Sequence, residues 1–380
     1  MRIALFTECY HPIVNGVVIS IATFTRELRR QGHEVEIYAP AYPGHRDEDP
    51  QVHRLTSLAL PTRPRYPLAL PYSSARVWPH LAARPPDVVH SQHPFLAGRE
   101  ARRVARRLGR PLILTYHTLL RWYAHYVPLP RPLVEAMAVW VSRQYANSAD
   151  RVVVPTRSVG QLLRSYGVRQ PIHAVPTGVD LELLRSTPRT PVRGRFGIPE
   201  GAPVVAYSGR LAKEKNLDLL ISAFAQVAQK RPEARLLLIG DGPWRERCEQ
   251  LAASLGMAAR VHITGYLPHQ QVFDCLAEAQ VFAFPSLTDT QGVAVLEAMA
   301  VGCPPVAVRS GAVVDVIRDQ QDGLVVAPTA EGMAEALEAV LASGELRARL
   351  AGQARRRAED FSAAAMADRL VGVYRQALSG

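Results

Sequence analysis

Short runs of Val, Ile, Leu and Ala recur along the chain, and each run is followed by a loop and then by a stretch with helical spacing. Such an apolar run predicts a strand that is buried on both faces of a sheet. In the first half these runs are residues 2–7, 34–39, 87–90, 112–117 and 150–155. Residues 20–31 instead place apolar side chains three or four positions apart, which predicts a helix with one buried face. The alternation of strand and helix predicts an α/β fold with parallel sheets.

The second half of the chain repeats this pattern. Its apolar runs are residues 203–208, 235–239, 261–265, 281–284, 305–308 and 323–326. Between the halves, residues 186–201 are rich in Pro, Arg and Gly, which is typical of a linker. The sequence therefore predicts two Rossmann-like domains, residues 1–185 and 186–361, and a final helix. A dehydrogenase is disfavoured, because Gly16 after the first strand is not part of a Gly-x-Gly-x-x-Gly series.

Length and composition agree with this organisation. A chain of 380 residues is long enough for two domains that each build a core. No run of 18 apolar residues is present, and the first residues read as a strand and not as a signal peptide. Cys9, Cys248, Cys275 and Cys303 are far apart, so neither a disulfide framework nor a zinc site is indicated. We expect a cytoplasmic protein.

The net positive charge of the chain lies entirely in its first half. Residues 1–185 contain 24 Arg, no Lys and 13 acidic residues, a net charge of +11. Residues 186–380 contain 21 basic and 21 acidic residues. The first half is therefore expected to face an anionic partner.

Six arginines between residues 99 and 110 fall on one stripe of a predicted helix. They are Arg99, Arg102, Arg103, Arg106, Arg107 and Arg110. A solvated face or a nucleic-acid site would explain such a stripe, but no nucleic-acid motif or aromatic stacking platform accompanies it. We favour an anionic membrane surface, with Arg102, Arg103, Arg106 and Arg107 as the contact residues and no nucleic-acid partner. The Pro-rich residues 60–80 add apolar and aromatic side chains beside Arg, although a packed loop explains them as well.

Residues 281–305 contain the densest chemistry. They predict a buried strand, a polar turn with Asp289, and a helix from about residue 290 that carries Glu297. Gly292 allows close approach of a ligand, and the first amides of the helix favour an anion. A sugar linked to a nucleotide diphosphate would suit these groups, and an ordinary strand-turn-helix with surface acids fits equally well. Lys215 lies in the loop after the first strand of this half. Lys is rare in this chain, so its presence there suggests that the loop requires a compact positive charge.

In the first half, His117 stands at the carboxyl end of a predicted strand, where ligands of open α/β sheets bind. The aromatic residues after it, Tyr123 and Tyr126 among them, would form a neighbouring wall. The alternative is a structural role, in which His117 forms hydrogen bonds at the strand end and takes no part in ligand binding.

Together these motifs resemble glycosyltransferase family 4, whose members have the GT-B fold. The resemblance rests on Gly-Arg-Leu-x-x-Glu-Lys-Asn at 209–216, Ile-Gly-Asp-Gly-Pro at 239–243 and the acid-x7-Glu helix. Residues 11–17, 115–118 and 176–180 resemble the branch that glucosylates diacylglycerol. In many family members Glu replaces Asp289 and Asn replaces Thr177.

The resemblance implies two domains that face each other across a cleft, with residues 362–380 packed back onto the first. It also implies roles for individual residues. The catalytic groups would be His117, Arg210, Lys215 and Asp289. The donor would be bound by Gly16, Gly209, Arg210, Lys215, Gly292, Val293 and Glu297. The acceptor would be bound by Asn15, Tyr123 and Tyr126. The reaction would retain the anomeric configuration and use no metal or other cofactor.

The implied activity is transfer of a hexose, glucose from a UDP-linked donor, to a lipid acceptor such as diacylglycerol at the inner face of the cell membrane. Three alternatives remain open from the sequence. They are a family 4 mannosyl- or galactosyltransferase with another acceptor, a nucleotide-sugar epimerase of the same architecture, and a binding module without catalysis.

Overall fold

The computed structural model describes residues 1–13, 15–60, 63–121, 129–186 and 188–380. The chain divides into two compact units. Unit 1 comprises Met1–Gly178 with Ala363–Gly380, and unit 2 comprises Val179–Ser362.

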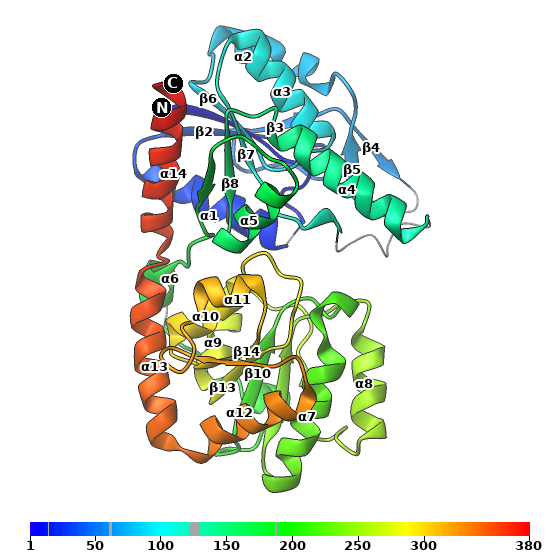
Figure 1. Ribbon diagram of the computed structural model, residues 1–380, viewed down its shortest axis with the longest axis vertical. Coiled ribbons are helices and arrows are strands. Elements are labelled where there is room, and N and C mark those ends of the chain that lie inside the picture. Colours follow the sequence, from blue (N-terminus) through cyan, green and yellow to red (C-terminus); the bar gives the residue numbers. More distant parts are fainter. Residues whose placement is uncertain (14, 61–62, 122–128, 187) are drawn as a thin grey trace. The chain divides into compact units, whose positions relative to one another are not determined.

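Unit 1 is built on a seven-stranded parallel sheet with the order β3-β2-β1-β6-β7-β8-β9 (Figure 1). Its strands are β1 (Arg2–Phe6), β2 (Glu34–Pro40), β3 (Val52–Leu55), β6 (Val88–Ser91), β7 (Leu112–Thr115), β8 (Arg151–Val154) and β9 (Ile172–Ala174). Its helices are α1 (Gly16–Arg30), α2 (Trp78–Ala83), α3 (Leu96–Leu108), α4 (Arg131–Ala146), α5 (Arg157–Ser165) and α14 (Ala363–Leu378).

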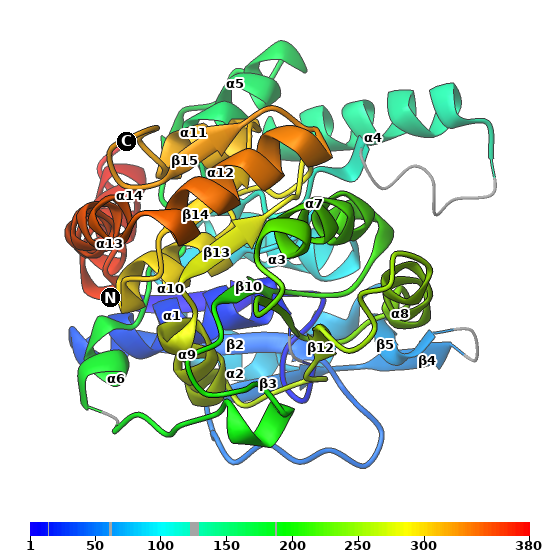
Figure 2. The same cartoon turned by 90° about the horizontal axis from the view of Figure 1, so that it is seen from below.

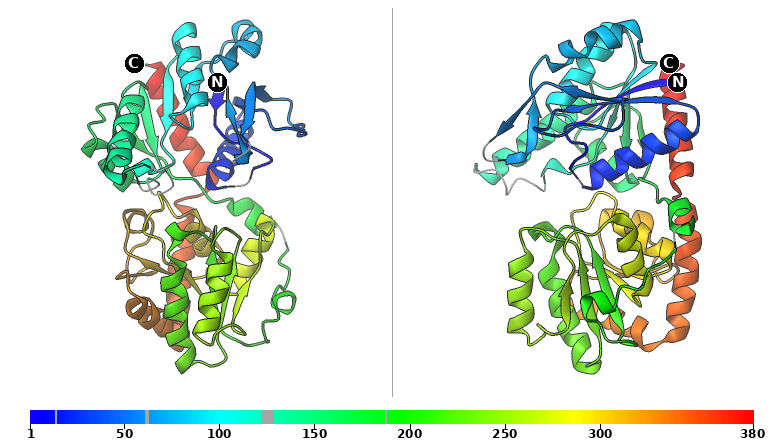
Figure 3. Two further views of the ribbon diagram at one scale, coloured as in Figure 1. Left: turned by 90° about the vertical axis from the view of Figure 1, so that its right-hand side faces the viewer. Right: turned by 180° about the vertical axis from the view of Figure 1, so that it is seen from behind.

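Alternating side chains of the strands build a core on each face of this sheet. Ile3 and Leu5 of β1 pack with buried residues of α1 and α14. Ala4 and Phe6 pack with buried residues of α3 and α5. Both faces are covered, which explains why the strands read as uninterrupted apolar runs (Figure 3).

Unit 2 has a six-stranded parallel sheet with the order β12-β11-β10-β13-β14-β15. Its strands are β10 (Val204–Ser208), β11 (Arg235–Ile239), β12 (Val261–Ile263), β13 (Val281–Phe284), β14 (Pro305–Val308) and β15 (Leu324–Val326). Its helices are α6 (Leu181–Ser186), α7 (Leu217–Lys230), α8 (Arg245–Ser254), α9 (His269–Glu278), α10 (Val293–Val301), α11 (Gly311–Val316), α12 (Ala330–Ala342) and α13 (Gly344–Glu359). Helices α9, α10 and α13 contribute to the core on one face, and α7, α8 and α12 to the core on the other.

The structure corrects three element predictions. The Pro-rich residues 60–80 are not one packed loop, because β4 (Ser57–Leu60) and β5 (Arg63–Ala69) form an antiparallel hairpin there. The arginine helix ends at Leu108, where Gly109 has φ 60°, so Arg110 lies beyond it. Helix α1 begins at Gly16, earlier than the predicted residue 20, because the Asn15 side chain caps it by accepting from the amides of Val17 and Val18.

All four cysteines are buried and free. Within the described ranges, none of the helices combines the length and the apolar character that crossing a bilayer requires.

Candidate active site

The strand order of unit 2 creates a switch point between β10 and β13. The chain leaves β10 toward β11 and β12 on one side, and after β13 it continues to β14 and β15 on the other. Loops that follow the carboxyl ends of two such strands diverge and leave room for a ligand. The loops in question are residues 209–216 and 285–292, and they contain most of the predicted donor-binding residues.

The loop after β10 begins with a glycine that a side chain could not replace. Gly209 has φ 151°, and a Cβ atom there would lie 2.8 Å from the hydroxyl oxygen of Tyr207. That hydroxyl donates to the backbone oxygen of Arg210 at 3.1 Å and fixes the turn. The Arg210 side chain is exposed, and among the described residues no carboxylate pairs with it. Arg210 therefore offers an uncompensated positive charge next to the switch point.

An ion pair joins the two loops. Lys215 Nζ lies 2.5 Å from Asp289 Oδ1, and both side chains are largely withdrawn from solvent. The second oxygen, Asp289 Oδ2, is buried and has no hydrogen-bond partner in the described part of the chain. A buried carboxylate oxygen without a donor is costly, so the site is suited to a ligand that brings a hydroxyl group.

Two hydrogen bonds from side chains to backbone oxygens also hold the two loops together beside this pair. Thr288 Oγ1 donates to the backbone oxygen of Glu214 at 3.2 Å. Asn216 Nδ2 donates to the backbone oxygen of Pro285 at 3.3 Å. Together with the Lys215–Asp289 ion pair, these two hydrogen bonds connect the loops at three points. The ion pair is therefore not an isolated contact between two surface side chains.

Helix α10 begins at Val293, three residues later than predicted. Gly292 precedes it with φ 75°, a left-handed conformation that ends the turn and that other residues rarely adopt. The amide of Val293 therefore belongs to the first turn, where the positive end of the helix dipole lies. Gly292 and Val293 therefore lie at the amino end of α10, where an anion would be favoured, and the predicted helix boundary was three residues too early.

Glu297 is buried one turn further along α10, and it is not without a partner. Its Oε1 accepts from Nε2 of His269 at 2.7 Å. His269 begins α9 and its ring lies 4.6 Å from that of Phe273. His269 was not predicted from the sequence, because no spacing links residue 269 to residue 297 and only the fold brings α9 beside α10.

Unit 1 has its own switch point, between β1 and β6. Glu8 follows β1, and its Oε1 accepts from the amide of Ala97 at 2.6 Å, close to the start of α3. The amide of Glu8 donates to Nδ1 of His93 at 3.3 Å. Burial raises the pKa of the Glu8 carboxyl to about 7, although the Ala97 and Gly98 amides oppose the shift. Glu8 and His93 were missed from the sequence, since a single acid after a strand has no distinguishing pattern.

His117 lies two residues beyond the end of β7, as part of a buried polar group in unit 1. Its Nε2 donates to Oε1 of Gln92 at 2.6 Å, and its ring lies 6.2 Å from that of His93. Burial lowers the pKa of His117 well below the ordinary range, and the neighbouring His93 and His90 lower it further. His117 is therefore a neutral imidazole at physiological pH.

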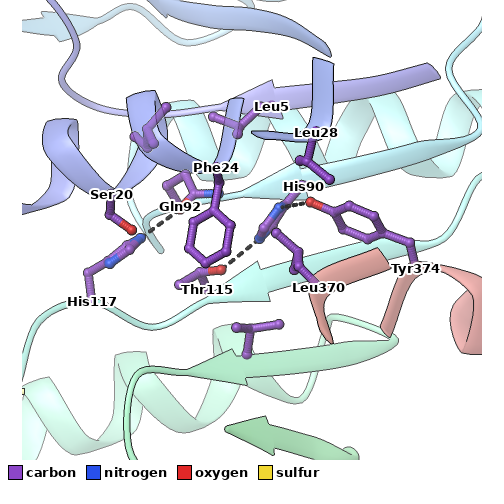
Figure 4. Close-up of a pocket in the computed structure, with 12 residues that line it drawn as sticks. Leu5, Ser20, Phe24, Leu28, His90, Gln92, Thr115, His117, Leu370 and Tyr374 are labelled. Atoms are coloured by element: carbon purple, nitrogen blue, oxygen red, sulfur yellow. Dashed lines mark hydrogen bonds between the residues drawn. The ribbon is translucent and has the colours of Figure 1, made fainter. Parts of the chain in front are cut away.

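A small cavity of about 10 Å³ separates this group from the C-terminal helix (Figure 4). His117, Gln92 and Ser20 line one part of it, and His90 lines another. His90 contacts the Tyr374 hydroxyl through Nδ1 and the Thr115 hydroxyl through Nε2, both at 2.7 Å. The cavity has room for a water molecule and not for a sugar. We therefore regard it as part of the packing around His117 and not as a substrate pocket.

The predicted acceptor residues are only partly described. Tyr123 and Tyr126 lie outside the described residues. Asn15 caps α1, and its Nδ2 is directed to Cys9 Sγ at 3.6 Å. Gly16, the first residue of α1, has no atom within 4 Å of the position that a Cβ would occupy. Neither packing nor backbone conformation requires glycine there, which leaves space for a ligand beside the helix start.

The arginine stripe of α3 lines an open hollow of about 550 Å³. Its lining residues are Arg99, Arg102, Arg103, Arg106 and Arg107. Two of these guanidinium groups lie over rings: Arg103 is 4.0 Å from the Tyr72 ring centroid, and Arg107 is 3.7 Å from that of Trp78. Arg103 also pairs with the buried Glu100. Of the other three lining residues, Arg99 and Arg106 are exposed and Arg102 is half-buried.

One cluster of metal-ligating side chains stands apart from these residues. Glu36, His53 and His80 could offer three ligand atoms within 4.8 Å of one another. The Arg2 guanidinium lies 3.0 Å from Glu36 Oε1, however, and the Tyr38 hydroxyl donates to Oε2 at 2.7 Å. Glu36 is already neutralised and hydrogen-bonded, so this cluster reads as a structural network.

Comparisons with known proteins identify the family. Residues 14–183 match the family model described as Glycosyltransferase Family 4, and residues 188–357 match the one described as Glycosyl transferases group 1. A GDP-mannose-dependent alpha-mannosyltransferase from Mycobacterium tuberculosis is 32% identical to this chain over 98% of it and 96% of that protein. The chain belongs to glycosyltransferase family 4.

This family 4 glycosyltransferase has other relatives. An alpha-monoglucosyldiacylglycerol synthase from Streptococcus pneumoniae is 29% identical over 91% of this chain and 80% of that protein. The solved sucrose-phosphate synthase from Thermosynechococcus elongatus superposes with a TM-score of 0.81 at 23% identity, covering 100% of this chain and 99% of that one. The predicted GT-B fold, with two parallel-sheet domains, is thereby confirmed.

Proposed function

We propose that this glycosyltransferase moves glucose from a UDP-linked donor to diacylglycerol or a closely related lipid. The observation that carries the donor half of this proposal is Asp289, whose Oδ1 is held by Lys215 while its buried Oδ2 has no partner in the described structure. A hydroxyl group of the transferred sugar would satisfy that oxygen. The lipid half draws on the relative named as an alpha-monoglucosyldiacylglycerol synthase.

The positive groups of unit 2 would bind the diphosphate. Arg210 and Lys215 lie on the loop after β10, and the amides of Gly292 and Val293 lie at the start of α10. Charge develops on the leaving diphosphate as the glycosidic bond breaks, and preorganised cations and amides stabilise that charge. These groups would take the place of a metal ion, so we propose that turnover needs no divalent cation.

Glu297 would accept the ribose hydroxyls of the donor. His269 already hydrogen-bonds one of its oxygens, which orients the carboxylate before the nucleotide arrives. Contacts to the ribose are the same in the ground state and the transition state, so they add affinity and not rate.

His117 would hydrogen-bond the reacting sugar or the acceptor hydroxyl as a neutral imidazole. Gln92 fixes the orientation of its ring. We further propose retention of configuration, because nucleotide-linked glucose is an α-glycoside and the lipid product of the named relative is an alpha-glucoside.

Unit 1 would bring the enzyme to the lipid at the inner face of the cell membrane. The arginine-lined hollow of α3 offers a concentrated positive charge, and the excess charge of the chain lies in residues 1–185. Anionic headgroups attract such a surface with about 1 kcal/mol for each basic side chain.

A second candidate is mannosyl transfer from GDP-mannose. The mannosyltransferase relative matches nearly the whole chain at 32% identity, and Asp289 has a shorter reach than the Glu that many family members carry. A screen of UDP-glucose, GDP-mannose and UDP-galactose against diacylglycerol, glucosyl-diacylglycerol and phosphatidylinositol separates these candidates. Product formed only from GDP-mannose would replace the first proposal with the second, and product formed only on phosphatidylinositol would overturn diacylglycerol as the acceptor.

A further inference from the structure

Helix α4 of unit 1 exposes a row of large apolar side chains. Leu133, Met137 and Trp140 are 59%, 48% and 60% exposed, and their spacing of four and three residues places them on one helical face. Leu129, just before the helix, is 54% exposed. Single exposed apolar residues are common, but a row of them on one face marks an interaction surface.

The opposite face of α4 already has its partner. Val134, Ser142, Tyr145 and Ala146 are buried. The hydroxyl of Tyr145 donates to Gly98 O at 2.6 Å, which ties α4 to α3. These contacts fix the orientation of α4 about its axis. The apolar row is therefore exposed because the other face of the helix is already packed against unit 1.

The charges on α4 favour an anionic partner. Its single acid, Glu135, is held by Arg121 at 2.9 Å and by Arg131 at 2.7 Å. Arg143, toward the other end of the helix, is exposed. The apolar face thus lies between basic side chains and carries no uncompensated negative charge, the pattern of helices that lie in a membrane interface with Trp at headgroup depth.

A second apolar surface lies on the same side of unit 1. The β4–β5 hairpin exposes Leu58 and Leu68, which are paired across the two strands and are 55% and 42% exposed. Figure 1 and Figure 2 both show α4 and this hairpin projecting from one side of the unit.

We propose that the Leu133–Met137–Trp140 face of α4 inserts into the acyl-chain boundary of an anionic phospholipid bilayer. The proposal rests on the proposed lipid acceptor and adds a specific element to it. The arginines of α3 would supply the long-range attraction, and α4 would supply apolar contact. Two weak signals together give stable but reversible membrane binding, whereas either alone gives marginal binding.

The two signals respond differently to salt. Attraction by α3 weakens as the Debye length falls from about 10 Å at 0.1 M to about 3 Å at 1 M. Apolar insertion does not weaken in this way, since it depends on the removal of apolar surface from water. Binding that survives high salt should therefore depend on α4.

The first test uses Trp140 as a reporter of insertion. The full chain and its Trp140→Phe variant are mixed with phosphatidylglycerol vesicles that carry bromine on the acyl chains, and fluorescence quenching is compared. The expected result is quenching in the wild type that is reduced in Trp140→Phe. Equal quenching in both proteins would overturn the proposal.

The second test measures vesicle binding in 1 M salt for Leu133→Gln with Met137→Gln. A matched control carries Leu255→Gln with Val314→Gln, two exposed apolar residues of unit 2. Binding at least tenfold weaker in the α4 variant than in the control is expected. Unchanged vesicle binding would overturn the proposal, and if sedimentation also showed a loss of dimer, the face would belong to a second copy of the chain.

Activity separates this proposal from the proposed function. With a water-soluble short-chain diacylglycerol, the α4 variant should transfer sugar at the wild-type rate, because this acceptor needs no bilayer. Absence of transfer to any diacylglycerol in the wild type would refute the proposed function while leaving the quenching test valid.

Discussion

At the scale of single residues, the proposed donor site rests on Lys215 and Asp289. A buried or half-buried charge is tolerated only when it is paired, and here each member compensates the other across two loops. A donor diphosphate would compete with Asp289 for Lys215, and a sugar hydroxyl would satisfy Asp289 Oδ2. The ion pair therefore holds the loops in the arrangement that the ligand would use.

Replacing Lys215 tests this role. Lys215→Ala should lower kcat/KM by roughly 100-fold or more, because a charge-assisted contact to the leaving group is lost. Lys213→Ala is the matched control, since Lys213 is exposed on the same loop and should change the rate less than threefold. Steady-state kinetics of both variants give the comparison, and equal effects would remove Lys215 from the site.

The two acids should separate into affinity and selectivity. Glu297→Gln should weaken nucleotide binding about tenfold with little change in kcat, because ribose contacts are uniform along the reaction. Asp289→Asn should instead change the ratio of kcat/KM between UDP-glucose and GDP-mannose. Calorimetry with UDP and kinetics with both donors measure these effects, and an Asp289→Asn enzyme with unaltered rate and donor ratio would contradict the assignment.

Glu8 should leave a signature in the pH dependence of stability. Its pKa is about 7 in the folded protein and about 4.5 when unfolded, so the folded state binds more protons between these values. The free energy of unfolding attributable to Glu8 therefore falls as the pH rises from 4.5 to 7, by up to about 3 kcal/mol. Glu8→Gln removes this dependence, and its stability relative to the wild type should increase over that range in urea titrations. A constant difference between the two proteins would mean that Glu8 titrates normally.

The candidate residues that were predicted from the sequence are those whose position follows from a local pattern. Asp289, Gly292 and Lys215 stand after predicted strands, and the carboxyl ends of strands are where ligands bind. His269, Gln92 and Glu8 were not identified, because their partners are separated from them by 25 to 89 positions and only the packed fold brings them together. Contacts of this kind leave no periodicity in a single sequence.

At the scale of elements, α3 is the clearest case of a correct pattern with an incomplete interpretation. The stripe was predicted to contact an anionic membrane through Arg102, Arg103, Arg106 and Arg107. Two of these, Arg103 and Arg107, lie over the rings of Tyr72 and Trp78. These contacts organise the residues after the hairpin and hold the guanidinium groups in place. Replacing them would disturb structure as well as charge.

A sharper test of α3 therefore uses its exposed arginines. Arg99→Gln with Arg106→Gln should weaken binding to acidic vesicles about 30-fold at 0.1 M salt, since each of the two basic side chains near an anionic leaflet contributes about 1 kcal/mol. Arg349→Gln with Arg356→Gln on α13 is the control of equal charge. Co-sedimentation with vesicles measures both, and equal binding by the two variants would exclude α3 from membrane contact.

Strands were predictable because both sheets are covered on both faces, which leaves uninterrupted apolar runs. The strand at 281–284 has the predicted bounds. The β4–β5 hairpin was not predicted, because proline in residues 60–80 argues against a central strand and this hairpin forms a separate two-stranded sheet. The start of α10 was misplaced because the left-handed conformation of Gly292 overrides helical spacing.

At the scale of the whole molecule, each unit carries a different part of the proposed chemistry. Unit 2 contains Arg210, Lys215, Asp289 and Glu297 near one switch point. Unit 1 contains His117, the basic helix α3 and the apolar face of α4. The positive charge follows this division, since its excess lies in residues 1–185. The residues proposed to bind the nucleotide-sugar thus lie in unit 2, and the surfaces proposed to contact lipid lie in unit 1.

The most direct test of this account is transfer itself. Purified enzyme is incubated with UDP-glucose and diacylglycerol in acidic vesicles with excess chelator, and the lipid product is analysed by mass spectrometry and by NMR of its anomeric proton. The account predicts an α-glucosyl-diacylglycerol that forms at an undiminished rate without divalent metal, and at a rate about 100-fold lower with Lys215→Ala. A β-linked product, or transfer that requires an added divalent metal, would contradict it.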